Sequence, residues 1–533
     1  MTKKLERIET TFTSPVMIYL SDDKYIDKKI LQSKYELLTT WWLHRLCTEG
    51  SGVLNIGANI GWYSILAAKV ATSSGFVLAV EPTDYAYEQL CGNIRANSLS
   101  NIDTLKAIVT SPNKSGARIV LDYDKNNYST NIFSGIRSSW SSRGSNQLDY
   151  QTNVPVDTIS YGDLIDRHWP NNKKLNLVII DVDGHESDIL SEIMHRPDLL
   201  GPAFIVEFNI TRSYDIEPLD ILAYFLKNNY NAYTEYGVPL SNSNLETELA
   251  RKPYGYSSNA SINLILLPPD SCFRFNRTNN ADDVIGRSLD VCESPLNILI
   301  PRSKDSGSTI GNKLVLHSGI SVDSDSYYPD LMRTLLVRNK GVHEPEEEFC
   351  FKKLMERILS NNCKSRASIM ELGCYWAFYT KWFLKELAQQ EPIAICVEPV
   401  ASNLSKGVSN LNDSKGRILF YNDYVCKSTR ADAPARLFDF GLAMEILGNN
   451  NLTLLHSDIQ GFETDLFDIA IPYFERKRID NVFVSTHSQR IHDHCISRLQ
   501  HHGYFINYAM PFSLSSSCAG FIYASLTDAL LLV

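Results

Sequence analysis

The sequence has no uninterrupted apolar stretch near 18 residues, and no apolar run follows its basic start at Lys3 and Lys4. We therefore expect neither a membrane-spanning helix nor a secretory signal. The 11 cysteines include no CxxC pair, which favours reduced thiols over a disulfide framework. These features predict a cytoplasmic protein.

An excess of positive charge is missing as well, since the formal net charge is −10. Nucleic-acid-binding proteins usually present a basic face to the phosphates, so we expect no nucleic-acid partner. The composition, with 44% hydrophobic and 21% charged residues, is typical of a soluble globular protein. A single core stops growing at about 250–300 residues. The length of 533 residues therefore predicts two domains.

A strand, a glycine turn and an acid occur in the same order in both halves of the chain. In the first half an apolar segment runs into a turn that begins at Gly57, and the next predicted strand ends at Glu81. In the second half the turn begins at Gly373, and the next strand ends at Glu398. The acid follows the glycine by 24 positions in the first half and by 25 in the second.

A third matched segment completes this repeat. Each half continues with a strand that ends in Asp-x-(Asp/Gln)-Gly-x-Glu, which begins at Asp181 and at Asp458. Strands that alternate with helical segments predict βαβ units and a parallel sheet. Two late strands in each half predict a closing antiparallel hairpin. We expect two tandem Rossmann-like α/β domains, each a mostly parallel sheet with helices on both faces and a terminal antiparallel strand.

The matched segments set the expected boundaries. Domain one should occupy residues 1–270, a linker and lead-in residues 271–340, and domain two residues 341–533. Within the connection, residues 301–309 are the most linker-like because they are polar and rich in serine and glycine. The first half has extra residues around 138–147, which predict either a surface insertion or a loop that covers the substrate.

The turn and the acid suit a nucleoside cofactor. Gly57 and Gly61 allow the backbone to approach a ligand where a strand passes into a helix. Asn59 lies where a dinucleotide-binding turn has its middle glycine, so that fingerprint is not met. S-adenosylmethionine has no phosphates and needs only a looser turn, and Glu81 or Glu398 could bind its ribose hydroxyls. The alternative interpretation is that both acids are solvent-exposed residues at strand ends.

Four segments of the first half resemble the ordered signatures of FkbM-type methyltransferases. They are Asn-Ile-Gly57-Ala-Asn-Ile-Gly-Trp-Tyr-Ser, Val154-Pro-Val-Asp-Thr-Ile, Ile-Asp181-Val-Asp-Gly-His-Glu and Ile-Val-Glu207-Phe. The resemblance implies a class I methyltransferase fold, S-adenosylmethionine as the methyl donor, and O-methylation. The implied acceptor is a sugar, a glycan or a hydroxylated small molecule.

The second half resembles a divergent branch of the same family through Glu371-Leu-Gly-Cys-Tyr-Trp-Ala, Asp458-Ile-Gln-Gly-Phe-Glu and Ser-Thr-His487-Ser. Each half departs from the family pattern once. Asn55 stands where an acid usually helps to hold the methionine end of the cofactor, whereas Glu371 keeps that acid. Conversely, Ala377 stands where the second glycine of the turn would fall.

A sugar hydroxyl is a poor nucleophile, so a base or a metal ion should assist its deprotonation. In the first half the candidate catalytic residues are Asp181, Asp183 and Glu207, at the predicted carboxyl ends of strands. Asp181, Asp183 and Asn209 could also hold a hard cation such as Mg²⁺ through oxygen ligands. A plain carboxylate base is the alternative to the metal.

In the second half the candidate catalytic residues are Asp458 and His487. His487 is the natural base there because the ordinary pKa of histidine lies near 6.5. The alternative interpretation is that His487 is a structural histidine at a strand end. We interpret His492 and His494 as helix surface.

Two other functions stay open. One half could be a degenerate copy that binds cofactor or acceptor without catalysis. Asp181-Val-Asp183 also resembles the DxD motif of metal-dependent glycosyltransferases, although the glycine turn and Glu81 favour methyl transfer. If both halves are active, their different strand-end residues predict two different acceptor positions.

Overall fold

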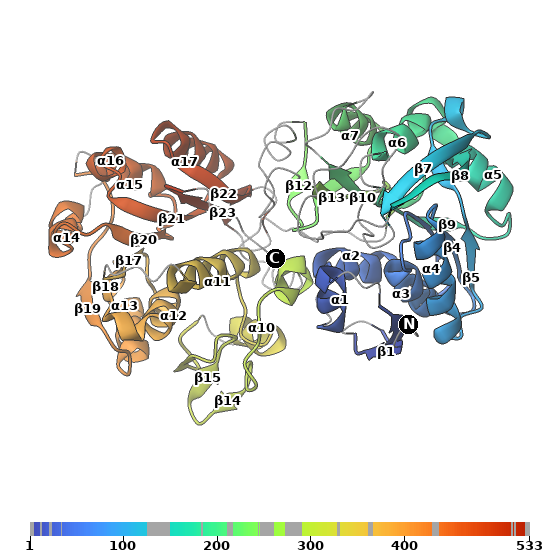
Figure 1. Ribbon diagram of the computed structural model, residues 1–533. Helices are drawn as coiled ribbons and strands as arrows, with labels where there is room; N and C mark the ends of the chain where they lie inside the picture. The colour runs from blue at the N-terminus through green and yellow to red at the C-terminus, as the bar shows by residue number, and fades with distance from the viewer. Residues whose placement is uncertain are drawn as a thin grey trace. The chain divides into compact units, whose positions relative to one another are not determined.

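The computed structural model divides into two compact units, Met1–Arg274 and Phe275–Val533, and each is described by itself (Figure 1). The structure describes residues 5–10, 13–20, 24–32, 35–124, 150–182, 185–209, 217–242, 245, 261–271, 290–327, 331–360, 366–428, 436–512, 515 and 519–527. No helix in these ranges is long and apolar enough to cross a membrane.

Unit 1 is built around a sheet that is mostly parallel. Eight strands of its described part pair side by side, and the last of them in sequence runs antiparallel between two neighbours. In spatial order they are β12 (Pro239–Leu240), β11 (Asn231–Thr234), β13 (Ser261–Leu267), β10 (Ala203–Asn209), β9 (Leu175–Ile180), β3 (Gly52–Ile56), β4 (Phe76–Val80) and β5 (Ile102–Leu105). The prediction of a parallel-rich α/β unit is confirmed.

Helices cover both faces of this sheet (Figure 1). Every residue of β3 is buried, as expected for a strand covered on both sides. Leu54 and Ile56 face a core that includes Ile189, Leu222 and Phe225. The helices on that face are α5 (Tyr161–His168), α6 (Glu186–His195) and α7 (Pro218–Lys227), and those on the opposite face include α2 (Leu37–Leu46), α3 (Trp62–Ala71) and α4 (Asp84–Ala96).

Unit 2 repeats this strand order. Seven strands of its described part pair in one sheet, and the last in sequence is again antiparallel between two neighbours. They are β19 (Arg417–Tyr421), β18 (Ile393–Val397), β17 (Ser368–Leu372), β20 (Leu452–Ser457), β21 (Ile479–Thr486), β23 (Gly520–Ser525) and β22 (Phe505–Met510). The strand register allows the two units to be compared residue by residue. Glu371 of β17 pairs with His456 of β20, just as Asn55 of β3 pairs with Ile179 of β9.

The helices of unit 2 follow the same division. One core joins Met370 and Leu372 of β17 to Leu466, Phe474 and Leu499. The helices on that face are α14 (Phe440–Ile446), α15 (Glu463–Ile469), α16 (Ile471–Glu475) and α17 (Gln489–His501), and the other helices of the sheet are α11 (Pro345–Ser360), α12 (Phe378–Glu386) and α13 (Ala401–Leu411).

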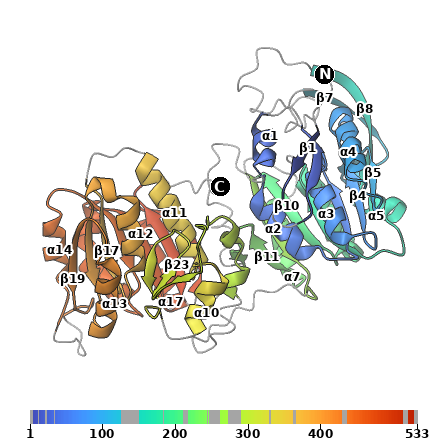
Figure 2. The same ribbon diagram turned by 90° about the horizontal axis from the view of Figure 1, so that it is seen from below.

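Small sheets accompany both large ones. In unit 1, β2 packs against α4, and its partner strand β1 is labelled in Figure 2. The small sheets are β1 (Leu5–Ile8) with β2 (Val16–Tyr19), β6 (Ile108–Thr110) with β8 (Tyr150–Ser160) and β7 (Arg118–Asp124), and β14 (Thr309–Ile310) with β15 (Lys313–Val315) and β16 (Ser321–Asp323).

The segment predicted to be most linker-like, residues 301–309, is hydrogen-bonded into unit 2. The main-chain N–H of Ser303 donates to the carbonyl of His317 at 2.8 Å, and that of Gly307 donates to Val315 at 2.8 Å. These residues therefore belong to the structured lead-in, which continues through α10 (Leu331–Arg338) to α11.

Candidate functional site

The glycine turn of unit 1 follows β3 and has three residues with positive φ. Gly57, Asn59 and Gly61 have φ values of 83°, 49° and 94°. A Cβ atom on Gly57 would lie 1.7 Å from the main-chain oxygen of Asp181. Only glycine fits this position, because the turn presses against the chain that leaves β9.

The turn of unit 2 has the same backbone with fewer glycines. Gly373, Tyr375 and Ala377 have φ values of 76°, 46° and 57°. A Cβ atom on Gly373 would lie 1.8 Å from the main-chain oxygen of Asp458. An alanine in the left-handed region costs roughly 1–2 kcal/mol, so unit 2 keeps this backbone against a local penalty.

The predicted ribose acids contact the middle of each turn. Glu81 Oε2 accepts from the N–H of Asn59 at 2.9 Å, and Glu398 Oε2 accepts from the N–H of Tyr375 at 3.2 Å. Each acid is only 5% exposed, and burial raises the pKa of both carboxyl groups above its ordinary value. Neither acid is the solvent-exposed strand end of the alternative reading.

A buried asparagine braces each turn, and the sequence analysis missed it. Asn93 Nδ2 donates to the carbonyl of Ile60 at 2.8 Å, and its Oδ1 accepts from the main chain of β2 at 2.6 Å. Asn410 Nδ2 donates to the carbonyl of Trp376, and its Oδ1 accepts from the main chain of β16, both at 2.9 Å. Each asparagine follows the buried acid of its turn by 12 positions, a spacing visible in the sequence.

The residues two places before each turn glycine bond to the following helix. Asn55 Nδ2 donates to Ser64 Oγ at 2.8 Å. Glu371 accepts from the N–H of Thr380 at 3.0 Å and also from its hydroxyl group. Burial raises the pKa of Glu371. These contacts tie Asn55 and Glu371 to the helix that follows each turn, and the role of Glu371 at the methionine end of the cofactor stays a prediction.

Asp181 and Glu207 of unit 1 follow the parallel pairing of β9 with β10, and both are partly exposed. Asp183 lies outside the described residues, as do residues 138–147 and the side chain of Asn209. Within the described part of the chain, no group of three or more His, Cys, Asp or Glu residues could hold a metal ion. The Mg²⁺ site stays a prediction.

Glu36 of unit 1 lies close to this strand end, although no motif marks it. It precedes α2 with φ of 39°, and its carboxylate accepts hydrogen bonds from the hydroxyl groups of Tyr35 and Tyr63. Burial and the charge of Glu207 raise the pKa of Glu36 to about 7, against the two hydrogen bonds. Burial also raises the pKa of Glu235 to about 8, against its bond from an asparagine.

His487 of unit 2 is held between two carboxylates. Its Nδ1 lies 2.7 Å from Glu463 Oε1, and its Nε2 lies 3.2 Å from Asp458 Oδ1. Burial alone would lower the pKa of His487, but the hydrogen bonds to these acids raise it to about 10. His487 therefore keeps its proton at neutral pH in this arrangement, in contrast to the free base expected from the ordinary histidine pKa.

A second buried ion pair lies beside it. Glu347 of α11 accepts from Ser485 Oγ at 3.0 Å and contacts His456 Nε2 through its other oxygen. Burial alone would lower the pKa of His456, but the charge of Glu347 and the hydrogen bond to it raise this pKa to about 9. Register places Ser485 where unit 1 has Glu207.

The interpretation of His492 as helix surface is wrong. Its side chain is 1% exposed, and its Nδ1 lies 2.9 Å from Thr486 Oγ1. His494 is exposed, as expected. The sequence pattern of α17 did not show that His492, rather than His494, faces the sheet.

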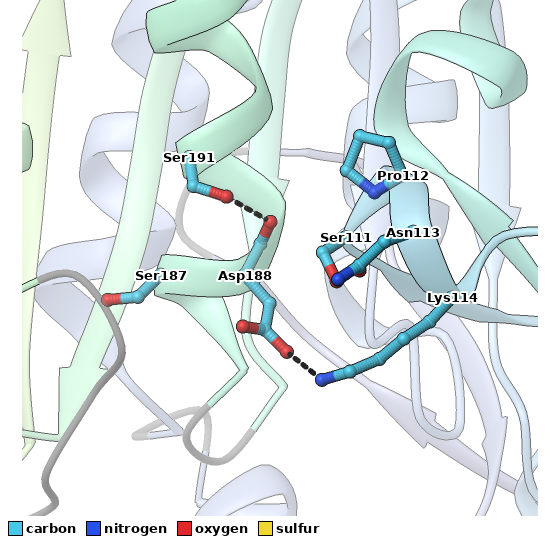
Figure 3. Close-up of a pocket in the computed structure, with 7 residues that line it drawn as sticks. All are labelled: Ser111, Pro112, Asn113, Lys114, Ser187, Asp188 and Ser191. Atoms are coloured by element: carbon cyan, nitrogen blue, oxygen red, sulfur yellow. Dashed lines mark hydrogen bonds and ion pairs between the residues drawn. The ribbon is translucent and has the colours of Figure 1, made fainter.

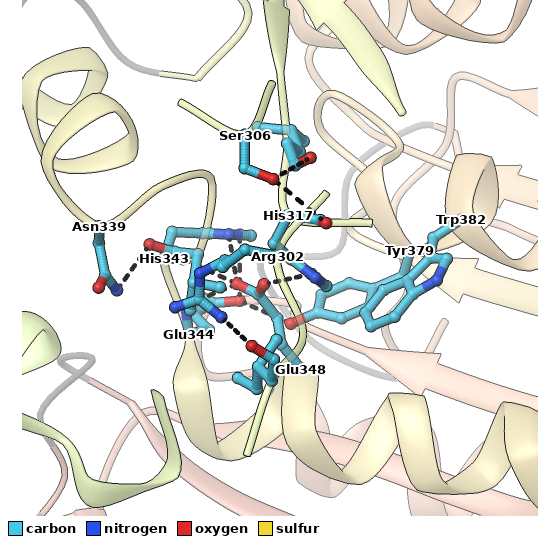
Figure 4. A network of polar contacts seen from close by, with 12 residues as sticks. Arg302, Ser306, His317, Asn339, His343, Glu344, Glu348, Tyr379 and Trp382 are labelled. Atoms are coloured by element: carbon cyan, nitrogen blue, oxygen red, sulfur yellow. Dashed lines mark hydrogen bonds and ion pairs between the residues drawn. The ribbon is translucent and has the colours of Figure 1, made fainter. Parts of the chain in front are cut away.

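A third polar network surrounds Glu348, which is fully buried (Figure 4). Its two oxygens lie 2.7 Å from His317 Nε2 and 2.7 Å from His343 Nδ1. Burial alone would raise the pKa of Glu348, but the two histidines hold it well below its ordinary value. The network fixes the start of α11 to the lead-in of unit 2.

A separate pocket of about 310 Å³ borders α6 in unit 1 (Figure 3). Lys114 Nζ and Asp188 Oδ2 form an ion pair across it at 3.2 Å. None of the predicted site residues lines it. The lining residues are Ser111, Pro112, Asn113, Lys114, Ser187, Asp188 and Ser191.

Residues 55–232 match the family described as "Methyltransferase FkbM domain". The match covers the first glycine turn, Glu81 and the strands through β10, so the resemblance of the first half is confirmed. A second copy is not matched and stays a prediction. No curated protein matches the chain.

Several solved methyltransferase structures are similar to parts of the chain. M. jannaschii TYW2 in complex with AdoMet is 12% identical, with a TM-score of 0.26, over 50% of this chain and 86% of that one. The O-methyltransferase TomG from Streptomyces achromogenes, in complex with SAM, is 11% identical, with a TM-score of 0.24, over 44% and 79%. An O-methyltransferase from Bacillus cereus in complex with SAH is 12% identical, with a TM-score of 0.24, over 43% and 79%.

Proposed function

We propose that this chain is an S-adenosylmethionine-dependent O-methyltransferase whose catalytic unit is unit 1 and whose acceptor is a sugar, a glycan or another hydroxylated molecule. We further propose that unit 2 is a second, divergent methyltransferase domain. One observation supports both statements best. In each unit a buried acid accepts a hydrogen bond from the middle N–H of a turn with three positive φ values.

The residues present in unit 1 fit a nucleoside cofactor. Glu81 Oε2 accepts one hydrogen bond from the turn, so a lone pair remains for a ribose hydroxyl. The Oδ1 atom of Asn59 is buried and has no hydrogen-bond partner among the described residues. A ligand group that donates to this oxygen would satisfy it. S-adenosylmethionine would supply a methyl group on a sulfonium, while the turn and Glu81 would orient it.

The alternative in which unit 2 binds cofactor without catalysis has specific support. Its strand-end histidine, His487, is paired on both ring nitrogens, and Ser485 replaces the acid of unit 1. Unit 2 therefore offers no neutral imidazole base at this place. The DxD glycosyltransferase alternative gains no support, because Asp183 lies outside the described residues.

Calorimetric titration with S-adenosylmethionine tests the proposal. We expect two sites in the wild type, and each of Glu81→Ala and Glu398→Ala should weaken one of them about 1,000-fold. Two lost charge-assisted hydrogen bonds cost about 4 kcal/mol together, which corresponds to this factor. The matched controls Glu88→Ala and Glu445→Ala remove exposed helical acids and should change neither site.

Each outcome has a distinct meaning. One site, lost only in Glu81→Ala, would make unit 2 a scaffold without cofactor. Absence of binding by folded wild-type protein would reject the methyltransferase proposal for the whole chain.

A further inference from the structure

A glutamate and a tyrosine pair in the same way in both units, and neither glutamate belongs to a motif discussed above. In unit 1 the Tyr63 hydroxyl, at the start of α3, donates to Glu36 just before α2. In unit 2 the Tyr379 hydroxyl, at the start of α12, donates to Glu344 Oε2 at 3.1 Å, just before α11. The tyrosine follows the turn glycine by six positions in each unit. Recurrence of the pair shows that its place beside the turn is a property of the fold.

In unit 1 this pair faces the predicted acceptor end of the sheet. Helix α2 contacts β10, the strand that carries Glu207, and the indole N–H of Trp42 on α2 donates to the carbonyl of Glu235 at 2.7 Å. Glu235 Oε2 accepts from Asn263 Nδ2 at 3.1 Å, and Asn263 lies opposite Glu207 in the register of β13 with β10. Helix α2, which Glu36 precedes, therefore packs against the strand that carries Glu207, and the charge of Glu207 acts on Glu36.

Helix α2 also carries a buried hydroxyl group, that of Thr39. Thr39 lies three positions after Glu36, as Glu347 lies three positions after Glu344. Glu347 reaches Ser485, which occupies the register position of Glu207. Thr39 is 2% exposed, and its Oγ1 has no hydrogen-bond partner among the described residues. At this helix position unit 2 has a carboxylate paired with an imidazole, whereas unit 1 has a buried hydroxyl group without a partner among the described residues.

We propose that Glu36 is the general base of unit 1, which takes the proton of the acceptor hydroxyl, and that Tyr63 and Tyr35 orient its carboxylate. This inference rests on the function proposed above. The hydroxyl oxygen forms the new C–O bond with its lone pair, and the C–S bond of the donor breaks with its electron pair remaining on sulfur. The proton moves to a carboxylate oxygen of Glu36 and then to water, and the products are an ether and a neutral thioether.

The charges around Glu36 suit this role. Among the described residues, the groups that face it are the hydroxyl groups of Tyr35 and Tyr63 and the carboxylate of Glu207, with Glu235 and Asp181 in the same cluster. Burial, followed by the charge of Glu207, raises the pKa of Glu36 to about 7. A base whose pKa lies near the working pH transfers protons most effectively.

Unit 2 supplies a matched control. Glu344 has the equivalent tyrosine bond, but Ser485 stands where Glu207 would be, and Glu347 is paired with His456. We therefore expect Glu344→Gln to leave methyl transfer unchanged.

The test compares the full-length wild type, Glu36→Gln, Glu36→Asp and Glu344→Gln. Methyl transfer from labelled S-adenosylmethionine to a mixture of neutral methyl glycosides gives kcat, and calorimetry gives the Kd of the cofactor. Loss of a general base should lower kcat at least about 100-fold in Glu36→Gln. The Kd should stay within about threefold, and Glu36→Asp should recover part of the rate. The wild-type rate should fall below pH 7, and that acid limb should disappear in Glu36→Gln.

A second readout needs neither donor nor acceptor. In protein labelled with ¹³C at glutamate Cδ, the resonance that disappears in Glu36→Gln should titrate near pH 7 in the wild type. A midpoint near the ordinary value of about 4.3 would overturn the proposal, and so would a Glu36→Gln variant that transfers methyl groups at the wild-type rate. Wild-type protein that fails to bind S-adenosylmethionine would instead reject the proposed function.

Discussion

The two units have the same strand order and turn conformation, but they differ in the charged side chains that these elements carry. Both turns hold three residues at positive φ, both are closed by a buried acid, and both are braced by a buried asparagine. In unit 1, Glu36 and Glu235 are partly buried, and that burial raises the pKa of each carboxyl group. Unit 2 instead pairs His456 and His487 with carboxylates.

Under the proposed function, this difference separates two requirements: the backbone shape that binds the cofactor and the titratable groups that carry out the reaction. The turn depends on backbone shape, which Tyr375 and Ala377 can adopt at some cost. Under the proposed function, the acceptor end depends on which groups can exchange a proton near neutral pH, and the charged groups near the ends of β10 and β21 differ between the units. Because His456 and His487 are paired with carboxylates, these two side chains of unit 2 are suited to hold structure rather than to take up a proton.

The largest expected effect concerns the first turn glycine. Gly57→Ala and Gly373→Ala should each lower the free energy of unfolding by about 3 kcal/mol, because the new Cβ meets a main-chain oxygen in a left-handed backbone. Gly116→Ala is the matched control, since its φ is 77° and no atom lies within 4 Å of the new Cβ. It should cost about 1 kcal/mol. Equal losses for all three variants, measured by denaturant unfolding, would show that the close approach is unimportant.

The next effect separates the units by pH. Glu235 and His487 both have a folded pKa above the ordinary value, so their contribution to stability is full below the ordinary pKa and is lost as the pH rises through the folded pKa. That window runs from about 4.5 to about 8 for Glu235 and from about 6.5 to about 10 for His487.

Melting temperatures of matched variants measure these windows. Relative to Glu235→Gln, the wild type should lose about 4 °C between pH 5 and pH 8 and then stay level. Relative to His487→Gln, it should lose a similar amount between pH 7 and pH 10. If both differences changed over the same pH range, the contrast between the two units would be wrong.

The smallest effect tests the cost of the altered turn. Ala377→Gly should stabilise the protein by about 1 kcal/mol, because glycine adopts φ of 57° without the penalty of a Cβ atom. The reciprocal change Gly61→Ala should destabilise it by more, since its new Cβ would also lie 2.6 Å from Leu90 Cδ1. A destabilised Ala377→Gly variant would indicate that the methyl group makes contacts worth more than the strain.

The sequence was sufficient to predict the parallel-rich sheets and the spacing of turn and acid. Gly57, Glu81, Gly373 and Glu398 are recognisable because strand ends and helix starts have local signals that repeat in both halves. The chain order of the elements then determines which strand ends meet. These predictions required only patterns within about 25 residues.

The residues that sequence reasoning missed depend on contacts across the fold. Glu36 accepts a hydrogen bond from Tyr63 because α2 packs against α3, and no sequence motif predicts that contact. His487 was expected to be a free base because its ordinary pKa is near 6.5. Its charge state depends on the two acids that the folded chain brings to its ring, Asp458 and Glu463.

The asparagine brace sets a lower limit on the fragment that could carry a working turn. The family match begins at residue 55, yet the Oδ1 atom of Asn93 is satisfied by the main chain of β2, at Val16–Tyr19. A fragment cut at residue 55 would leave that buried oxygen without its donor and would also remove Glu36. The smallest fragment worth expressing from this half therefore begins before Val16, and its counterpart from the second half begins before Ser321.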